Sequence, residues 1–270
     1  MTELLHKFFK DRKIEYYSVL DYRDCRVISE EIMSRESFTP RSVITYLLPY
    51  YAGETVNLSR YAAALDYHYV IKELNNELGE LLTSAFPGAH YRGYGDHSPI
   101  DERHAAAISG LGIRGDSTLL INEKYGTYVF IADMITDVAP ELLGALAPVS
   151  AGECIHCGRC LAACPSGVLR KESTACLSAI TQRKGELTEE EKNMMRKVGT
   201  VWGCDECQSC CPYNANAAQT PIDIFREQRI PNLTFEILDG MTKQELSIRA
   251  FAWRGRGVLE RNLHVLKENE

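Results

Sequence analysis

Cysteine spacing constrains this chain more than any other feature. Of its ten cysteines, all but Cys25 lie between Cys154 and Cys211, and they form two similar runs. The runs read Cys154-x2-Cys157-x2-Cys160-x3-Cys164-Pro165 and Cys204-x2-Cys207-x2-Cys210-Cys211-Pro212. Clustered thiols in a reducing compartment are metal ligands or catalysts more often than disulfides. The chain is therefore expected to hold a compact metal-binding segment within a larger protein of 270 residues.

The spacing of both runs is that of bacterial ferredoxins. Two-residue gaps bring successive thiolates onto one [4Fe–4S] cubane, and the fourth cysteine of such a run binds the other cluster. Zinc is the alternative, because Cys-x2-Cys pairs also suit a tetrahedral zinc ion. Zinc explains neither the third cysteine at the same spacing nor the two Cys-Pro endings. The sequence therefore predicts two [4Fe–4S] clusters.

The ligand sets follow from this crossed arrangement, with one choice left open. The first cluster is expected to take Cys154, Cys157, Cys160 and Cys211. The second is expected to take Cys164, Cys204 and Cys207 and needs one ligand more. Either Cys176 or Cys210 could complete it. Cys210 fits the local spacing, but its side chain must then diverge from that of Cys211.

Composition and charge exclude several classes of protein. The formal net charge is −7, so any contact with RNA must depend on a local basic patch. The N-terminus lacks the apolar core of a signal peptide. The longest apolar run, residues 43–52, is too short to cross a bilayer and contains Pro49. A cytoplasmic protein without membrane contact is expected.

The pattern of apolar residues predicts an α+β fold with a cysteine-rich segment. A Pro/Ser/Gly stretch near residue 148 suggests a boundary. We expect an α+β domain over 1–148, a ferredoxin-like double-cluster domain over 149–220, and a helical tail over 221–270. Periodicity predicts helices over 60–84, 104–109 and 188–198 and a buried strand over 42–50. It also predicts that strands 118–122 and 127–135 pair through residues 123–126.

Two motifs in the first half bear on chemistry. Gly110-x-Gly112-x-x-Gly115 fits a dinucleotide fingerprint literally, but it follows an expected helix and leads into a strand, the reverse of a Rossmann loop. Glycine backbone could instead press against another large cofactor. The run from Asp96 to Arg103 could hold a general acid. It could equally be a turn that begins a helix, with Ser98-Pro99 as cap and first turn.

Taken together, these segments resemble the epoxyqueuosine reductase family of cobalamin-dependent iron–sulfur enzymes. The resemblance spans nearly the whole chain in the family's order. It includes both cysteine runs and the segments Ser59-Arg-Tyr-Ala-Ala-Ala-Leu-Asp-Tyr-His68, Asp96-His-Ser-Pro-Ile-Asp-Glu-Arg103, Gly110-Leu-Gly112 with Gly115, Asp133-Met-Ile-Thr-Asp137 and Arg254-Gly-Arg-Gly-Val-Leu-Glu-Arg-Asn262.

The resemblance implies a specific activity. It implies base-off cobalamin in the N-terminal domain, reduced through the two clusters, which acts on the epoxide of the modified wobble base in tRNA. It implies that Asp96 is the acid and that Cys176 rather than Cys210 is a ligand. The residues that it places near the corrinoid are Arg60, Tyr61, Gly110, Gly112, Gly115 and Ser117. The implied partners are tRNA carrying epoxyqueuosine and an external low-potential electron donor such as flavodoxin or ferredoxin.

Two departures from the family pattern keep other functions open. Ile113 stands where the family usually has tryptophan, and Asp116 stands where it usually has lysine. The sequence also stops eight residues beyond Asn262, as expected of a short form without the C-terminal helical repeats that hold tRNA. One alternative is a corrinoid and iron–sulfur reductase of a small molecule, related to reductive dehalogenases. The other is a two-cluster electron-transfer protein that does no chemistry itself.

Overall fold

The computed structural model describes residues 1–267, and contacts divide the chain into two compact units. Unit 1 comprises Met1–Pro49 and Tyr67–His156, and unit 2 comprises Tyr50–Asp66 and the chain from Cys157 onward. The predicted division ran linearly, with boundaries at 148 and 220. The contacts instead place residues 50–66 with the cysteine segment and join the C-terminal tail to that same unit.

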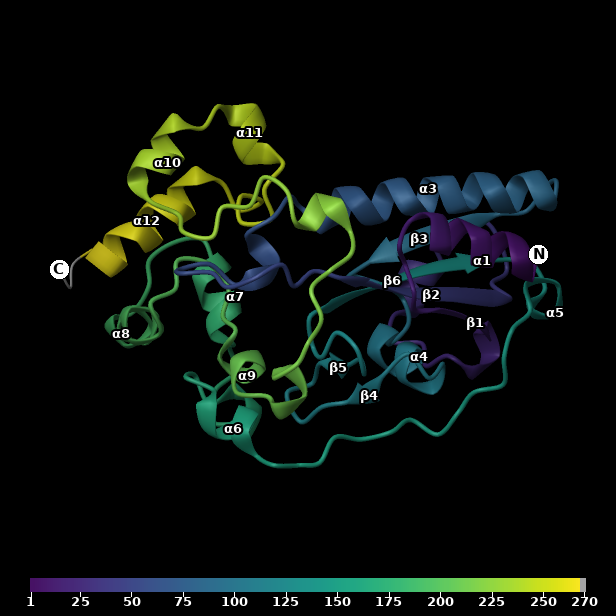
Figure 1. Ribbon diagram of the computed structural model, residues 1–270, viewed down its shortest axis with the longest axis horizontal. Coiled ribbons are helices and arrows are strands. Elements are labelled where there is room, and N and C mark those ends of the chain that lie inside the picture. Colours follow the sequence, from purple (N-terminus) through teal and green to yellow (C-terminus); the bar gives the residue numbers. More distant parts are fainter. Residues whose placement is uncertain (268–270) are drawn as a thin grey trace. The chain divides into compact units, whose positions relative to one another are not determined.

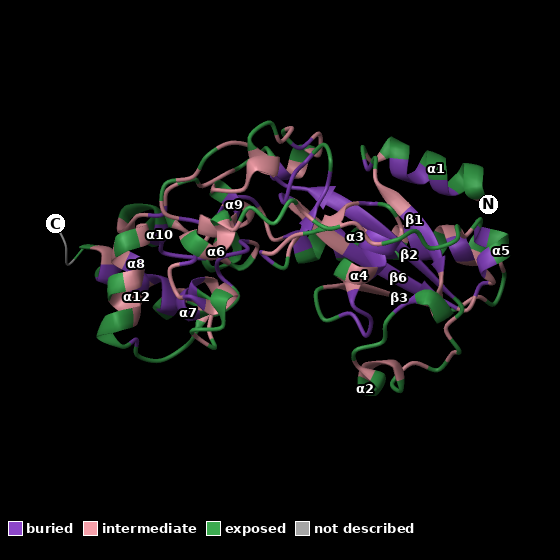
Figure 2. Ribbon diagram, turned by 90° about the horizontal axis from the view of Figure 1, so that it is seen from below, coloured by how far each residue is buried: buried purple, intermediate pink, exposed green. Residues whose placement is uncertain are grey.

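Unit 1 is built on a four-stranded antiparallel sheet in the order β1-β2-β6-β3 (Figure 1). Its strands are β1 (Tyr17–Asp21), β2 (Ser42–Pro49), β3 (Tyr91–Gly95) and β6 (Val129–Thr136), and a small ribbon pairs β4 (Ile113–Arg114) with β5 (Leu120–Ile121). Its helices are α1 (Thr2–Asp11), α2 (Glu30–Met33), α3 (Tyr67–Ala85), α4 (Glu102–Ile108) and α5 (Pro140–Leu143). The buried strand predicted over 42–50 is confirmed as β2, which is buried along its whole length (Figure 2).

Helices cover both faces of this sheet, because successive strand side chains point to opposite sides. On one face, Tyr46 of β2 packs against Phe9 of α1 and donates a hydrogen bond to Asn75 of α3. On the other face, Val43 and Leu47 of β2 pack with the alanines of α4. Thr45 lies between Val43 and Leu47, so it shares the α4 face, and its cross-strand neighbour is Asp133 of β6. A polar pair is thus enclosed on an otherwise apolar face.

The second half of unit 1 departs from the predicted hairpin. β6 pairs with β2 and β3 in the main sheet, whereas β5 pairs with β4, so the prediction that residues 118–122 pair with 127–135 is wrong. The turn between them does form: the Asn122 side chain accepts hydrogen bonds from the backbone N–H groups of Lys124 and Tyr125. A turn of this kind fixes a local reversal of the chain and does not decide where the flanking strands go.

Two predicted helices differ in where they begin. The helix expected over 60–84 begins at Tyr67 as α3, because residues 57–59 are extended and bond with the backbone of Val201 and Trp202 in unit 2. The helix expected over 104–109 is α4, which begins at Glu102. Its cap is Asp101, whose carboxylate accepts from the His104 N–H at 3.1 Å, so the expectation that Ser98 caps it is wrong.

Unit 2 is a set of short helices connected by loops. These are α6 (Arg159–Ala163), α7 (Leu177–Gln182), α8 (Glu189–Val198), α9 (Glu206–Ser209), α10 (Phe235–Gly240), α11 (Lys243–Ser247) and α12 (Arg256–Lys267). The prediction of a helix near 188–198 is confirmed: α8 begins with a capping box between Thr188 and Glu191. Trp202 is the largest fully buried side chain and lies in a core cluster with Phe251 and Leu259. A packed core therefore supports the cysteine loops from the C-terminal side of the sequence.

Within residues 1–267, the structure contains no helix that combines the length and the hydropathy needed to cross a bilayer.

Cys25 is buried in the core of unit 1, and burial raises the pKa of its thiol to about 12. A thiol of this kind is inert at neutral pH, which agrees with ordinary packing.

Candidate functional site

Cys207 of unit 2 lies within electrostatic range of three other cysteines of that unit, which are Cys164, Cys176 and Cys204. Burial raises the pKa of the Cys207 thiol, and the charges of Cys204, Cys176 and Cys164 raise it further. For the Cys204 thiol, burial raises the pKa to about 12, and Cys176 again contributes. Cys204 and Cys207 thus each resist a separate negative charge, and such thiols are suited to a cationic centre because a coordinating metal favours the thiolate form.

Cys164 has a different environment from the other three. Burial alone would raise the pKa of its thiol, but hydrogen bonds from the backbone of Leu169, the Ser166 hydroxyl and the backbone of Gly167 outweigh this and lower it. Backbone N–H groups that converge on a thiolate are also a feature of iron–sulfur sites, where such hydrogen bonds tune the cluster.

Cys210 lies with a different set of thiols. The other cysteines that raise the pKa of its thiol, after burial, are Cys211 and Cys157. Its Sγ lies 3.5 Å from the carbonyl oxygen of Cys207 and donates to it. Cys176, by contrast, interacts with Cys204 and Cys207. The two candidates for the open ligand position thus differ in the cysteines that surround them.

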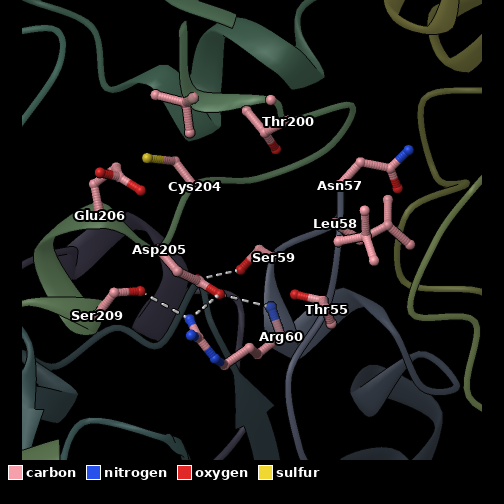
Figure 3. Close-up of a pocket in the computed structure, with 13 residues that line it drawn as sticks. Thr55, Asn57, Leu58, Ser59, Arg60, Thr200, Cys204, Asp205, Glu206 and Ser209 are labelled. Carbon is pink, nitrogen blue, oxygen red and sulfur yellow. Dashed lines mark hydrogen bonds and ion pairs between the residues drawn. The ribbon is translucent and has the colours of Figure 1, made fainter. Parts of the chain in front are cut away.

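Asp205 connects the second cysteine run to residues 59–60 (Figure 3). Its carboxylate accepts hydrogen bonds from the Ser59 hydroxyl, from the Arg60 backbone N–H at 2.7 Å and from Arg60 Nη1 at 3.1 Å. Arg60 also donates to Ser209 Oγ at 3.0 Å. The ion pair is well shielded, with side-chain exposures of 12% for Arg60 and 9% for Asp205. Arg60 therefore holds the loop that carries Cys204 and Cys207.

Tyr61 is also engaged within unit 2. Its hydroxyl accepts hydrogen bonds from the Trp202 indole at 3.1 Å and from the Gln182 amide at 3.3 Å. A polar cavity of about 180 Å³ lies beside the Arg60–Asp205 pair, with Thr200, Cys204 and Ser209 among its lining residues (Figure 3). Pockets that hold drug-sized ligands are about 300–1,000 Å³, so this cavity is too small for a corrinoid.

Local packing explains why two of the three glycines in the 110–115 loop of unit 1 must be glycine. A Cβ on Gly112 would lie 2.6 Å from the Ile121 carbonyl oxygen, so Gly112 allows β4 and β5 to approach each other. A Cβ on Gly115 would lie 3.1 Å from atoms of Ile121 and Ser117. Gly110 differs, because it has a positive φ of 76° and an added Cβ would meet nothing nearer than Val149 at 3.8 Å. Among these glycines, Gly110 leaves the most open backbone.

Cys154 lies in unit 1 beside His156 and Asp116. His156 Nδ1 is 2.8 Å from Asp116 Oδ1 and 4.0 Å from Cys154 Sγ. The Asp116 carboxylate raises the pKa of the His156 imidazole, with a smaller effect of Glu153. Sequence reasoning noted the unusual anion at position 116 but missed this partner, because the two residues are far apart in the chain.

Asp96 lies in a loop with unusual backbone conformation. Asp96 and His97 both have positive φ, 61° and 31°, which non-glycine residues rarely adopt and which often marks functional sites. The Tyr67 hydroxyl donates to Asp96 Oδ2, and His68 Nε2 lies 3.3 Å from the same oxygen. Partial burial would raise the pKa of Asp96, but the hydrogen bonds from His68 and Tyr67 outweigh it and lower the pKa. The side chain remains 50% exposed, so a substrate could reach it.

Two further carboxyl groups of unit 1 have raised pKa values: Asp133, on the face of the sheet that α4 covers, and Glu102, the first residue of α4. Asp133 is 1% exposed, and burial raises its pKa to about 6 against the lowering effect of the Thr45 and Ser98 hydroxyls. Burial and the charges of Asp133 and Asp96 raise the pKa of Glu102 to about 8. Sequence reasoning assigned no role to Asp133. The available signal was a single carboxylate inside an otherwise apolar strand.

Two family models match the chain. One, described as a 4Fe-4S double cluster binding domain, matches residues 153–214, and the other, described as "Epoxyqueuosine reductase QueG, DUF1730", matches residues 36–97. The epoxyqueuosine reductase of Leadbetterella byssophila is 30% identical over 239 residues, which cover 85% of this chain and 76% of that protein. The chain belongs to the epoxyqueuosine reductase family. The predicted family, its oxidoreductase class and the double-cluster domain are thereby confirmed.

Other epoxyqueuosine reductases extend the comparison. That of Cyclobacterium marinum is 29% identical over 248 residues, 84% of this chain and 76% of its own length. That of Escherichia coli is 30% identical over 177 residues, 64% of this chain and 45% of its own length. The matched region thus spans about three quarters of the C. marinum and L. byssophila proteins and about half of the E. coli protein.

Solved epoxyqueuosine reductases share the fold. The structure from Streptococcus thermophilus superposes with a TM-score of 0.80 at 23% identity and covers 100% of this chain and 81% of that one. A structure of an epoxyqueuosine reductase with an epoxyqueuosine-modified tRNA-Tyr stem loop gives a TM-score of 0.79 at 20% identity. The predicted α+β fold class with a double-cluster segment is confirmed.

Proposed function

We propose that this chain reduces epoxyqueuosine to queuosine at the wobble position of tRNA, using two [4Fe–4S] clusters and base-off cobalamin. The observation that carries the proposal is the accessible Asp96 carboxyl, within hydrogen-bond reach of Tyr67 and His68, in a chain of this family. The relative solved with an epoxyqueuosine-modified tRNA stem loop supports tRNA as the substrate. An acid at this position suits a reaction that expels an epoxide oxygen.

The proposed cluster ligands are those that the sequence suggests, with Cys176 in the open position. The proximity of Cys176 to Cys204 and Cys207 supports this choice, as does the separate set formed by Cys210, Cys211 and Cys157. Asp205 and Arg60 would fix the second run in place before iron binds. The proposed ligands are Cys154, Cys157, Cys160 and Cys211 for one cluster and Cys164, Cys176, Cys204 and Cys207 for the other.

The cobalamin proposal depends on family membership and on the lack of a cobalt-binding histidine motif in the sequence. The sequence lacks the Asp-x-His-x-x-Gly motif through which other corrinoid carriers ligate cobalt, which fits a base-off cofactor without a protein histidine. Its proposed contacts are the open backbone at Gly110, with Gly112, Gly115 and Ser117 of the same loop, and Arg60 and Tyr61 of unit 2. When bound, cobalamin supplies a strongly reducing cobalt nucleophile, and low-potential clusters can deliver electrons to it.

The protein's own part in the reaction is to hold and move protons. Asp96 would donate a proton to the epoxide oxygen as that oxygen departs, and Tyr67 would fix the orientation of the carboxyl through its hydroxyl. His68 contacts the same oxygen from the neighbouring position of α3. Because these contacts favour the ionised carboxylate, Asp96 must gain a proton before each donation. An external low-potential donor such as flavodoxin or ferredoxin would supply the electrons, and a reducing cytoplasm would keep the thiols free to bind iron.

The proposal is tested with the holoenzyme, prepared anaerobically with iron, sulfide and cobalamin. Wild type, Asp96→Asn and the control Asp11→Asn, which changes an exposed carboxylate of α1, are given a chemical reductant and epoxyqueuosine-containing tRNA. We expect Asp96→Asn to lose at least about 100-fold in rate, as removal of a general acid does. Its iron content and its cob(II)alamin spectrum should match those of the wild type.

Other outcomes separate the alternatives. Full activity of Asp96→Asn would refute the acid assignment. Retained cobalamin without turnover of tRNA would indicate a small-molecule reductase instead. Two clusters without bound cobalamin would indicate an electron-transfer protein.

A further inference from the structure

Trp253 of unit 2 is an exposed aromatic side chain that is held in a fixed orientation. It lies just before α12, and 58% of its surface is exposed. Its indole Nε1 donates a hydrogen bond to the side-chain oxygen of Gln182 at 3.0 Å. The guanidinium carbon of Arg254 lies 3.7 Å from the centroid of the indole ring. Two contacts therefore hold a planar aromatic surface in place while most of it stays open to solvent.

A chain of hydrogen bonds joins Trp253 to Tyr61, one of the proposed cobalamin contacts. Gln182 uses both ends of its amide, because its oxygen accepts from Trp253 and its nitrogen donates to the Tyr61 hydroxyl at 3.3 Å. The indole of Trp202 donates to the same hydroxyl at 3.1 Å. Trp202 is fully buried in unit 2, so it anchors the chain in the core. A ligand on Trp253 would thus be separated from Tyr61 by one bridging side chain.

Cationic side chains lie on the two segments that hold Trp253. Arg183 and Lys184 directly follow Gln182 and are exposed. Arg261 of α12 donates to the backbone carbonyl oxygen of Arg183 at 2.7 Å, which joins α12 to this loop. Burial and then the charge of Arg183 lower the pKa of the Arg261 guanidinium. The fold therefore holds two like charges close together.

Few carboxylates neutralise these cations. Within residues 1–267, Lys184, Arg254 and Arg261 form no ion pair. Arg183 does form one, with a carboxylate of α8 at 2.6 Å. Arg256 does not belong to the group, because two carboxylates pair with it. Uncompensated positive charge in a chain of net charge −7 favours a polyanion, and it supplies the local basic patch that contact with RNA requires.

A flat aromatic surface combined with uncompensated cations suits single-stranded nucleic acid. Unpaired bases stack on aromatic rings and on the planes of arginine guanidinium groups, while phosphates contact arginine and lysine. The bases of a duplex are already stacked on one another, so a duplex cannot use the aromatic surface. Cobalamin could stack there, but it carries a single phosphate and would leave most of the cations unmatched. The surface therefore fits an RNA loop better than the cofactor.

We propose that Trp253 and Arg254 stack an unpaired base of the RNA loop that presents the wobble base. Lys184 and Arg261 contact the phosphates of the same loop. The hydrogen bonds that lead to Tyr61 keep this contact close to a proposed cobalamin-binding residue, so the stacked base helps to hold the neighbouring wobble base for reduction. This inference rests on the proposed function for its RNA partner, but the contact itself needs neither cobalamin nor turnover.

The test uses the full chain with both clusters reconstituted and a fluorescently labelled RNA stem loop that lacks the epoxyqueuosine modification. Binding is followed by anisotropy at several salt concentrations. Trp253→Leu should bind about tenfold more weakly than the wild type, as loss of a base stack does, with an unchanged salt dependence. Trp253→Phe keeps an aromatic face and should retain most of the affinity. A fully paired RNA duplex should bind all three proteins about equally.

The cations should have a different signature. Lys184→Ala should weaken binding of the stem loop and reduce the slope of log affinity against log salt by about 0.7, the value for one phosphate contact on a single strand. The matched control Lys7→Ala, at an exposed position of α1, should change neither quantity. In addition, 5-iodouridine placed in the loop should cross-link to Trp253 under ultraviolet light, as mass spectra of the peptides would show. Because Trp253 is exposed and is not a proposed ligand, all variants should retain the iron content of the wild type.

The outcomes keep this inference apart from the proposed function. If Trp253→Leu binds the stem loop as tightly as the wild type, or if the cross-link forms only at other residues, the inference is overturned and the proposed function is untouched. If Trp253→Leu binds RNA normally but loses cobalamin on gel filtration, the surface holds the cofactor and the inference is again overturned. If the wild type binds no stem loop even at low salt, the RNA substrate of the proposed function is refuted, and this inference with it.

Discussion

The substitution Asp133→Asn tests the energetics of the buried carboxylate independently of catalysis. Asn has the same shape, is neutral at all relevant pH values, and retains an oxygen that can accept from the Thr45 hydroxyl. In the wild type, burial raises the pKa of Asp133 from 3.8 to about 6. A difference of about two pKa units, at about 1.4 kcal/mol for each, corresponds to about 3 kcal/mol of stability.

The sign follows from the direction of the shift. A carboxyl group whose pKa is raised in the folded protein contributes most stability below its unfolded pKa, here 3.8, and loses that contribution as pH rises through the folded value of about 6. Wild type and Asp133→Asn should therefore have similar stability at pH 4. At pH 7 the variant should be the more stable by about 3 kcal/mol.

Amide hydrogen exchange in peptides from β2 and β6 measures this locally, without unfolding the cluster segment. After correction for intrinsic exchange rates, protection in the variant relative to the wild type should rise by about two orders of magnitude between pH 4 and pH 7. The control Asp11→Asn, at an exposed position, should show a nearly constant difference from the wild type. A constant difference for Asp133→Asn as well would refute the assignment of a buried charge.

Four further substitutions test other parts of the structure. Cys176→Ser should reduce iron from about eight to about four per chain, whereas Cys210→Ser should leave it unchanged; the reverse result would exchange their roles. Asn262→Ala removes hydrogen bonds of 2.7 Å to two buried carbonyl oxygens and should destabilise unit 2 by about 3 kcal/mol, seen as faster exchange in α7. Gly112→Ala introduces a Cβ 2.6 Å from the Ile121 carbonyl oxygen and should cost about 1–3 kcal/mol, seen as faster exchange in β4 and β5.

The features that the sequence predicted well are those encoded locally. Cysteine spacing identifies the double-cluster segment because the ligand geometry of a cubane requires that spacing. The strand at residues 42–50 and the helix α8 are specified by their own apolar pattern and capping residues. Family resemblance supplied Asp96, which no local physical pattern distinguishes from a surface carboxylate.

The features that could not be predicted from the sequence depend on contacts between segments that are distant in the chain. The partner of β6 is β2 rather than β5, since sheet pairing is decided by which strands bury the most apolar surface together. Arg60 was expected near a cofactor, and its ion pair with Asp205 was not foreseen, because residues so far apart give no local signal. The raised pKa of Glu102 likewise arises from burial and from the charge of Asp133, a residue of another element.

The placement of residues 50–66 in unit 2 has a consequence for how the chain matures on the ribosome. This segment is synthesised between two parts of unit 1, yet its partners Val201 and Trp202 emerge only after residue 200. The hydrogen-bonding groups of its extended backbone must therefore be satisfied by water until residues 201–202 have been synthesised. Unit 2 is thus expected to acquire native order later than unit 1, so iron can be inserted stably only after residues 201–202 have been synthesised. A fragment that begins at the cysteine runs would lack this segment and should assemble its clusters poorly.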